Sequence, residues 1–213
     1  MKGRYLLPGD TILYANIDEF LSKIQHKVLG TNLSHSSKIY SQLKDTVLEL
    51  EADVKVRLHT YSYLDDDIDL KHREIYRWNP QIFRQDLMNE VLEQVRKEFE
   101  GELYGFVQWP TIGIRRLLET ILPGVIAKRV RSWHILYKWG VSCSELLHVD
   151  EQRILDIHIE YYKKNQIEIG YERAVTYMQD MKRELERYNK DIFTPEDLRV
   201  LYDQFPILIW RIA

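Results

Sequence analysis

The sequence lacks the cysteine pairs on which many small domains depend. Cys143 is the only cysteine among 213 residues, so the chain cannot form an internal disulfide, and no two cysteines are spaced to hold a structural zinc ion. A chain of this length can bury a substantial core without either. We therefore expect a single domain over residues 1–213, with no metal and no cofactor.

Excess basic charge and long apolar runs are also missing. The 30 basic and 33 acidic residues give a formal net charge of -3, which excludes the strongly basic composition typical of nucleic-acid-binding proteins. No apolar run approaches a membrane span, and Tyr5, Leu6 and Leu7 form too short a run for the core of a signal peptide. We therefore expect no nucleic-acid partner, no stable membrane insertion, and a cytoplasmic or otherwise intracellular location.

What the sequence does contain is a helix start at its only cysteine. Ser142 is followed three positions later by Glu145 and then by two leucines, a pattern typical of a capping box. This pattern predicts that Ser142 is the N-cap and Cys143 the first helical residue. The positive end of a helix dipole stabilises a thiolate, which is the reactive form of cysteine, and lowers the thiol pKa. Cys143 is therefore a candidate nucleophile, expected to be acidic and accessible.

The ordinary alternative is that Cys143 is a small buried residue, because free cysteines are among the most buried residue types and are usually inert. A basic partner decides between the two interpretations. His35 is a candidate partner, because the small serines around it leave room for another group to approach. A solitary histidine is otherwise more often a satisfied surface or core residue.

Short runs of β-branched, aromatic and alternating apolar residues predict the strands of an antiparallel sheet. The runs are residues 11–15, 34–40, 46–51, 54–58, 74–78 and 206–212, the last of them as a buried strand. His35 would then lie on the second strand and Glu49 on the third, where a carboxylate could stand beside the imidazole.

Helical spacing of apolar residues predicts helices against this sheet. They are expected after Asp18, from Asn79 to Gly101, over residues 111–122 and 171–188, and from Thr194 onward. The predicted fold class is therefore α+β, an antiparallel sheet or partial barrel packed on helices. A helical insertion at about residues 161–191 is interpreted as an inserted helix or arm that could meet a partner.

Two charged segments are weighed for ligand binding. The acidic run 65–69 lacks the glycine and the final glutamate of an EF-hand loop, so it is interpreted as a solvated loop. The segment 115–138 mixes basic residues with tryptophan and tyrosine. That mixture suits an anionic or lipid-like substrate, and equally suits solvated basic faces with aromatic anchors in the core.

Four motifs follow one another along most of the chain. They are residues 8–13 (PGDTIL), 34–35 (SH), 142–146 (SCSEL) and 194–198 (TPEDL), and residues 101–106 (GELYGF) add a looser fifth. In this order they resemble the circularly permuted NlpC-like branch of the papain-like cysteine hydrolases, the YiiX/YaeF group. The likeness is to its Gly-Asp strand, its Ser-His strand start, its Cys-Ser-Glu helix start, its Thr-Pro-x-Asp-Leu element and its Gly-x-x-Tyr-Asp-Phe segment.

The resemblance implies a permuted papain-like fold with Cys143 as nucleophile, His35 as base and a third polar group that orients the imidazole. Residues 47–49 (VLE) align best with the hydrophobic-Glu strand of the group, so Glu49 is the predicted third residue in preference to Glu51. The two glutamates share one face of a strand, so spacing alone does not choose between them. Tyr104 is implied as a substrate-binding residue.

The implied chemistry is that of a cysteine peptidase or amidase. A Cys143 thiolate would attack an amide (peptide or N-acyl) or ester carbonyl, and water would hydrolyse the acyl-enzyme. The substrate would be a peptide, a murein-derived molecule or a lipid-like acyl compound. An acyltransferase and a non-catalytic binding or structural protein on the same scaffold stay open as alternatives. Lys38 departs from the resemblance, because the corresponding strand of the group is plainly apolar there.

Overall fold

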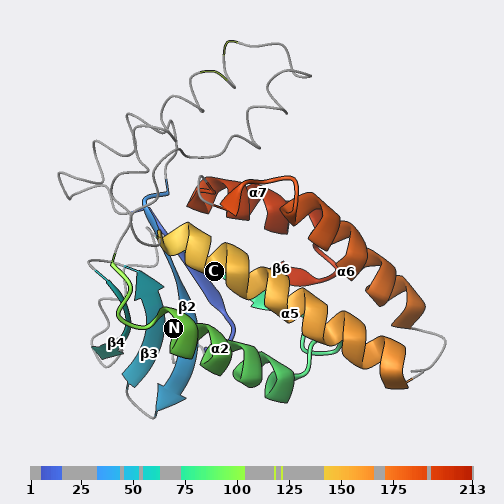
Figure 1. Cartoon of the computed structure of the whole chain (residues 1–213), viewed down its shortest axis with the longest axis horizontal. Coiled ribbons are helices and arrows are strands. Elements are labelled where there is room, and N and C mark those ends of the chain that lie inside the picture. Colours follow the sequence, from blue (N-terminus) through green and yellow to red (C-terminus); the bar gives the residue numbers. More distant parts are fainter. Residues whose placement is uncertain are drawn as a thin grey trace.

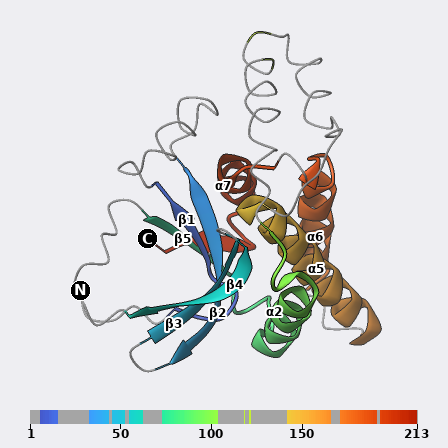
Figure 2. The ribbon, with the colours of Figure 1, turned by 60° about the vertical axis from the view of Figure 1, so that its left-hand side comes forward.

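The computed structural model describes residues 6–15, 33–43, 46–52, 55–62, 73–103, 118, 121, 142–165, 171–190 and 193–212. Within these residues the fold is α+β, with a six-stranded antiparallel sheet on one side and a layer of helices on the other (Figure 1, Figure 2). The predicted fold class is confirmed at this level.

The sheet has the strand order β4-β3-β2-β1-β5-β6. Its strands are β1 (Thr11–Tyr14), β2 (His35–Leu43), β3 (Thr46–Ala52), β4 (Val56–Ser62), β5 (Arg73–Trp78) and β6 (Ile209–Arg211). Strands β2, β3 and β4 form the antiparallel meander that the alternating pattern predicts. The ladder between β2 and β3 is irregular at one point, because Tyr40 is an extra residue between the pairs of Ile39 and Ser41.

The described helices are α2 (Gln85–Phe99), α5 (Cys143–Asn165), α6 (Tyr171–Leu185) and α7 (Pro195–Gln204). Helix α5 is central: it runs between α2 on one side and α6 and α7 on the other, and it packs on β2 and β3 (Figure 1). Helix α7 begins as its sequence predicts, because Thr194 and Asp197 form a capping box and Pro195 stands in the first turn. Helix α5 therefore lies against two strands of the meander.

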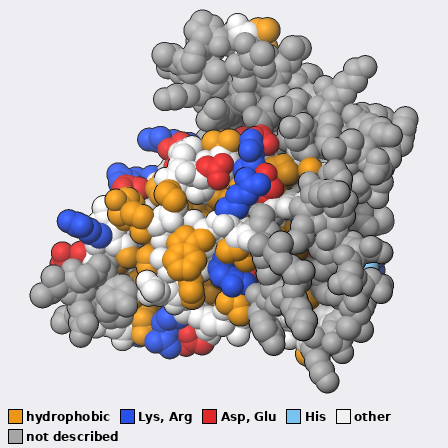
Figure 3. All heavy atoms as spheres, turned by 180° about the vertical axis from the view of Figure 1, so that it is seen from behind, with side chains coloured by type: hydrophobic (Ala, Val, Ile, Leu, Met, Phe, Trp, Pro, Cys, Tyr) orange, Lys and Arg blue, Asp and Glu red, His pale blue; other side chains and the backbone are white. Residues whose placement is uncertain are grey.

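Buried apolar residues lie on both faces of the sheet. The larger cluster fills the space between the sheet and the helices and includes Leu13, Leu50, Leu147, Met178 and Tyr202. A smaller cluster on the other face comprises Leu6, Ile12, Ile39, Val47 and Ile75. Seen from behind, the described surface mixes hydrophobic with positively and negatively charged side chains (Figure 3).

Helix α6 belongs to the larger cluster. Ala174, Met178, Met181 and Leu185 are buried in it, whereas Tyr177, which the sequence places on the same apolar face, is 39% exposed. The expected arm for a partner is therefore wrong for α6, since its apolar face packs on the rest of the chain. The first residues of the predicted insertion, 161–165, are the last turn of α5.

Two predicted element boundaries are also corrected. Helix α2 begins at Gln85 and not at Asn79, because Asn79 forms a turn in which its side chain accepts from the Gln81 N–H at 3.0 Å. The last strand is confined to β6, because the Leu208 N–H bonds back to the Phe205 carbonyl in another turn. Strand β6 lies at the edge of the sheet rather than in its interior.

Several predictions fall outside the described residues. They are the helix after Asp18, the acidic run 65–69, Tyr104, and all but residues 118 and 121 of the helix 111–122 and of the basic and aromatic segment 115–138. In the part of the chain that the structure describes, no helix combines the length and the apolar character needed to cross a lipid bilayer.

The Gly-Asp motif has a structural role at the start of β1. Gly9 has a φ of +93°, which favours glycine, and its N–H bonds to the Ile39 carbonyl. Asp10 is buried and accepts two hydrogen bonds from the Arg77 guanidinium, at 2.9 and 2.6 Å. This paired contact ties β1 to β5 at the end of the sheet away from His35.

A buried ionic cluster joins β2 to α5. Lys38 is fully buried, and its Nζ lies 3.1 Å from Asp150 Oδ2, donates to Glu151 Oε1, and donates to Thr11 Oγ1 at 3.0 Å. Tyr202 of α7 also donates to Glu151. Burial raises the pKa of Asp150 to about 6, although the charge of Lys38 opposes that rise. The lysine that interrupts an apolar strand in the sequence is thus explained by carboxylates on a distant helix.

We predict that Lys38→Met lowers the free energy of unfolding by about 3–5 kcal/mol, because two buried carboxylates lose their cation. Urea denaturation measures the loss, and adding Asp150→Asn and Glu151→Gln should recover much of it. The control Lys182→Met removes a partly exposed ion pair between α6 and Asp156 of α5, and should cost less than about 1 kcal/mol. Equal losses in the two lysine variants would contradict the prediction.

Candidate active site

Cys143 is the first residue of α5, as the sequence predicts. The Glu145 N–H donates to Ser142 Oγ at 3.1 Å, so Ser142 caps the helix. The Ser144 hydroxyl donates to the Phe193 carbonyl at 2.5 Å and fixes this turn to the segment before α7. The expected accessibility is wrong, because Cys143 is only 2% exposed. Its thiol is packed at the end of the sheet, where β2 begins.

His35 is the first residue of β2 and contacts the Cys143 thiol through a hydrogen bond. Its side chain is 26% exposed, so the pair lies at the border between core and surface. The ring of Tyr14 packs against the imidazole with 5.5 Å between ring centroids. The structure therefore brings together the two residues that the sequence proposed as nucleophile and base.

The carboxylate beside His35 is that of Glu51, and the prediction of Glu49 is corrected. His35 Nε2 lies 3.4 Å from Glu51 Oε2, a long hydrogen bond. In the ladder Glu51 stands opposite Ser37, and Glu49 stands opposite Ile39. Because His35 precedes Ser37 by two residues, Glu51 is its diagonal neighbour and Glu49 lies one further step away along the strand. Nε2 is thus turned to the carboxylate, which leaves Nδ1 for the sulfur.

Glu49 has a different role. It is fully buried and accepts hydrogen bonds from the Tyr14 hydroxyl and, at 2.6 Å, from Ser37 Oγ. Burial, followed by the charge of Glu49, raises the pKa of Tyr14 well above its usual value, so the phenol stays protonated and keeps donating. Glu49 therefore affects His35 indirectly, because it holds the ring of Tyr14 against the imidazole.

The electrostatics of the three residues favour a thiolate and an imidazolium. Burial alone would raise the pKa of Cys143, but the charge and hydrogen bond of His35, with a contribution from Ser36, lower it to about 7. Burial alone would lower the pKa of His35, but Cys143 and then Glu51 raise it to about 10. The Glu51 pKa falls to about 2, since His35 and His59 outweigh the effect of burial. Between pH 7 and pH 10 the ion pair is therefore the main form.

Sequence reasoning missed three residues around this site, namely Tyr14, Arg57 and His59. Arg57 and His59 lie on β4 and stand opposite Glu51 and Glu49 in the ladder. Alternation in residues 54–58 was a usable signal, because it places Arg57, and His59 by extension, on the face that the two glutamates share.

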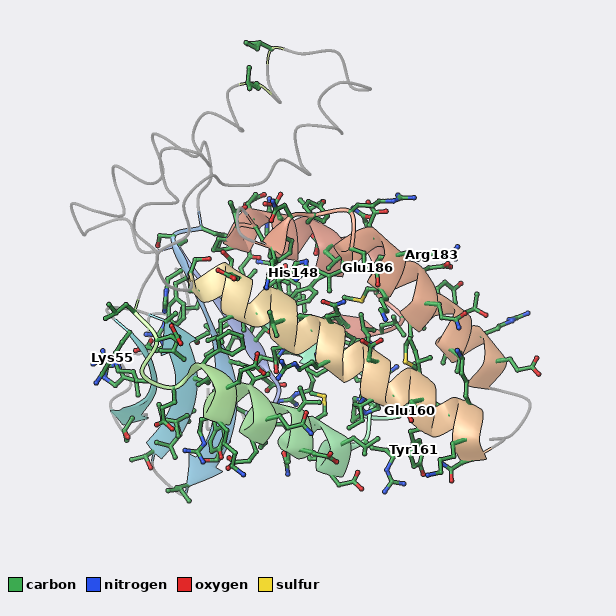
Figure 4. The ribbon with its side chains drawn as sticks, viewed as in Figure 1. Lys55, His148, Glu160, Tyr161, Arg183 and Glu186 are labelled. Atoms are coloured by element: carbon green, nitrogen blue, oxygen red, sulfur yellow. The ribbon has the colours of Figure 1, made fainter. Side chains whose placement is uncertain are left out.

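Two other histidines of α5 form hydrogen bonds with backbone groups. His148 lies in the second turn of α5 (Figure 4), and its Nε2 bonds to the Leu185 carbonyl at the end of α6 at 3.2 Å. His158 is buried too, and it accepts from the Arg84 N–H at 2.9 Å ahead of α2. Among the residues described, no group of three or more His, Cys, Asp or Glu side chains is arranged to hold a metal ion.

Comparison with known proteins adds no relative. No protein-family model matches the chain, and no curated protein matches it either.

We predict that iodoacetamide alkylates Cys143 more slowly than an exposed thiol, because Cys143 is only 2% exposed, but with a pH midpoint near 7, because the imidazolium stabilises the thiolate. In His35→Ala the midpoint should rise above that of an ordinary thiol, about 8.5, because burial then acts without a counter-charge. Mass spectrometry of the adduct gives the rate at each pH, and the denatured protein supplies the reference. An unchanged midpoint in His35→Ala would contradict the assignment.

The two glutamates can be separated in the same assay. Glu51→Gln should raise the alkylation midpoint, because the His35 imidazolium loses its carboxylate, and Glu49→Gln should change it less. Thermal midpoints of both variants are the control for folding. A larger shift in Glu49→Gln at equal stability would restore Glu49 as the third residue.

Proposed function

We propose that the protein is a cysteine hydrolase in which Cys143 attacks an amide or ester carbonyl. The observation that carries the proposal is the contact of a thiol at a helix start with an imidazole that a buried carboxylate also contacts. A purely structural cysteine needs neither partner. With Glu51 in place of Glu49, the proposed triad is Cys143, His35 and Glu51.

In the first half of the proposed reaction, the Cys143 thiolate forms a bond to the carbonyl carbon and the carbonyl oxygen becomes an oxyanion. The N–H groups in the first turn of α5 point toward the helix start, and the Cys143 N–H is the proposed oxyanion donor. The intermediate collapses when the bond from carbon to the leaving nitrogen or oxygen breaks. The leaving group takes its proton from the His35 imidazolium, which becomes neutral.

In the second half, neutral His35 removes a proton from water, and the resulting hydroxide attacks the thioester carbonyl. The bond from carbon to sulfur breaks, the acid product leaves, and the thiolate and imidazolium are restored. Glu51 stabilises the imidazolium whenever it forms, and it fixes the ring orientation. Replacement of water by an alcohol or amine would make the same site an acyltransferase.

The arrangement also supports, as a proposal, the permuted papain-like fold implied by the resemblance. A strand carrying the histidine and a neighbouring strand carrying the carboxylate pack on a helix that begins with the cysteine. Here the histidine strand comes first in the chain and the cysteine helix follows. The geometry of such a site, and not its chain order, defines the chemistry. The substrate would be a peptide, a murein-derived molecule or a lipid-like acyl compound, with Tyr104 kept as a predicted contact.

A p-nitrophenyl ester series with acyl chains of increasing length tests the proposal. We expect a burst of p-nitrophenol equal to one equivalent of protein, with the acyl group on Cys143 in the mass spectrum. His35→Ala should slow acylation by roughly 10² to 10⁴-fold, the usual contribution of a positioned acid or base.

Cys143→Ser is the control for other nucleophiles, and thermal midpoints show whether each variant is folded. Absence of a Cys143 adduct with every ester, while the alkylation midpoint is still near pH 7, would favour the non-catalytic alternative. Faster deacylation by added alcohol or amine than by water would favour the acyltransferase.

A further inference from the structure

A second histidine contacts the carboxylate of the proposed triad. His59 Nδ1 lies 2.8 Å from Glu51 Oε1, whereas His35 Nε2 lies 3.4 Å from Glu51 Oε2. Glu51 is thus bridged between two imidazoles, one on each oxygen. Its shorter bond is to His59.

The geometry fixes which group donates. Arg57 Nη2 lies 3.5 Å from His59 Nδ1 and 3.6 Å from Glu51 Oε1, so it is too far for a short hydrogen bond to either. The 2.8 Å contact requires a proton between His59 Nδ1 and the carboxylate, and the carboxylate, whose pKa is lowered to about 2, does not carry it. His59 Nδ1 is therefore the donor, in its neutral or its charged form.

The strand register explains how His59 reaches this position. His59 stands directly opposite Glu49 on β3, and Arg57 stands opposite Glu51. The His59 side chain therefore reaches diagonally across the pair of strands to the buried carboxylate. His59 and Arg57 are 40% and 39% exposed, while Glu51 is 3% exposed, so the contacts run from the surface to the buried carboxylate.

We infer that His59 is a positioning residue, which holds Glu51 Oε1 so that Oε2 faces His35. A carboxylate on a flexible glutamate side chain can rotate, and a long 3.4 Å contact to His35 does not by itself prevent that. The short bond from β4 does prevent it. This role of His59 rests on the proposed function, since the position of Glu51 affects the rate only when the His35 imidazolium forms during the reaction.

The test compares His59→Leu, which removes the donor, with His59→Asn, whose side-chain amide can place an N–H close to the position of Nδ1. We expect His59→Leu to raise the pH midpoint of Cys143 alkylation by about 0.5 and to slow ester acylation about tenfold. His59→Asn should remain within about threefold of the unmodified protein in acylation. His59→Leu should lower the thermal midpoint, because the buried Glu51 carboxylate loses a donor, so all rates are compared at a temperature at which the three proteins are folded.

A double variant shows whether His59 acts through Glu51. In the Glu51→Gln background, adding His59→Leu should change neither the alkylation midpoint nor the acylation rate, because the carboxylate to be held is gone. Equal effects of His59→Leu in the two backgrounds, or no effect in either, would overturn the inference. Alkylation by iodoacetamide needs no substrate, so a protein that hydrolyses no ester refutes the proposed function while the midpoint still decides the role of His59.

Discussion

The placement of the Cys143–His35 site depends on the buried ionic cluster of Lys38, Asp150 and Glu151. Displacement of a fully buried cation from its carboxylates would leave buried charges uncompensated, a cost that adds to that of disturbing the close-packed apolar core. Lys38 lies three residues after His35 on β2, and Asp150 lies two helical turns after Cys143 on α5. The cluster therefore restricts both the translation of α5 along its axis and its rotation relative to β2. These two displacements set the distance from the Cys143 sulfur to the His35 imidazole.

Much of this arrangement could be predicted from local sequence. The start of α5 at Cys143 follows from the Ser142 cap, and the meander follows from alternation in residues 46–58, because both signals are encoded within a few consecutive residues. The start of α2 was missed for the opposite reason, because the contacts that fix it involve partners far along the chain. The Asn79 N–H bonds to the Leu208 carbonyl, and the Arg84 N–H bonds to His158. Propensity describes the interior of an element better than its ends.

The identity of the third residue could not be predicted in this way. Glu49 and Glu51 have the same alternation, the same charge and nearly the same burial, so only the pairing of β2 with β3 distinguishes them. Pairing is a tertiary property, defined here by the pair of Leu43 with Thr46 and by the extra residue at Tyr40. The same holds for Lys38, which departs from an apolar pattern until α5 supplies its two carboxylates. The resemblance suggested the kind of site to look for, and the strand register shows that Glu51 is the carboxylate beside His35.

The extra residue at Tyr40 also determines which charged side chain of β2 lies beside Glu51. Counting from the pair of Leu43 and Thr46, an uninterrupted ladder would place Lys38 opposite Glu51, with both side chains on the same face. The bulge offsets the count by one, so Lys38 faces the helices while Glu51 faces His35. The bulge thus separates the ion pairs of Lys38 from the contact of His35 with Glu51, although Lys38 and His35 lie on the same strand. Without it, Lys38 would compete with the His35 imidazole for the Glu51 carboxylate. One carboxylate would then have to serve both the packing of α5 and the proposed site.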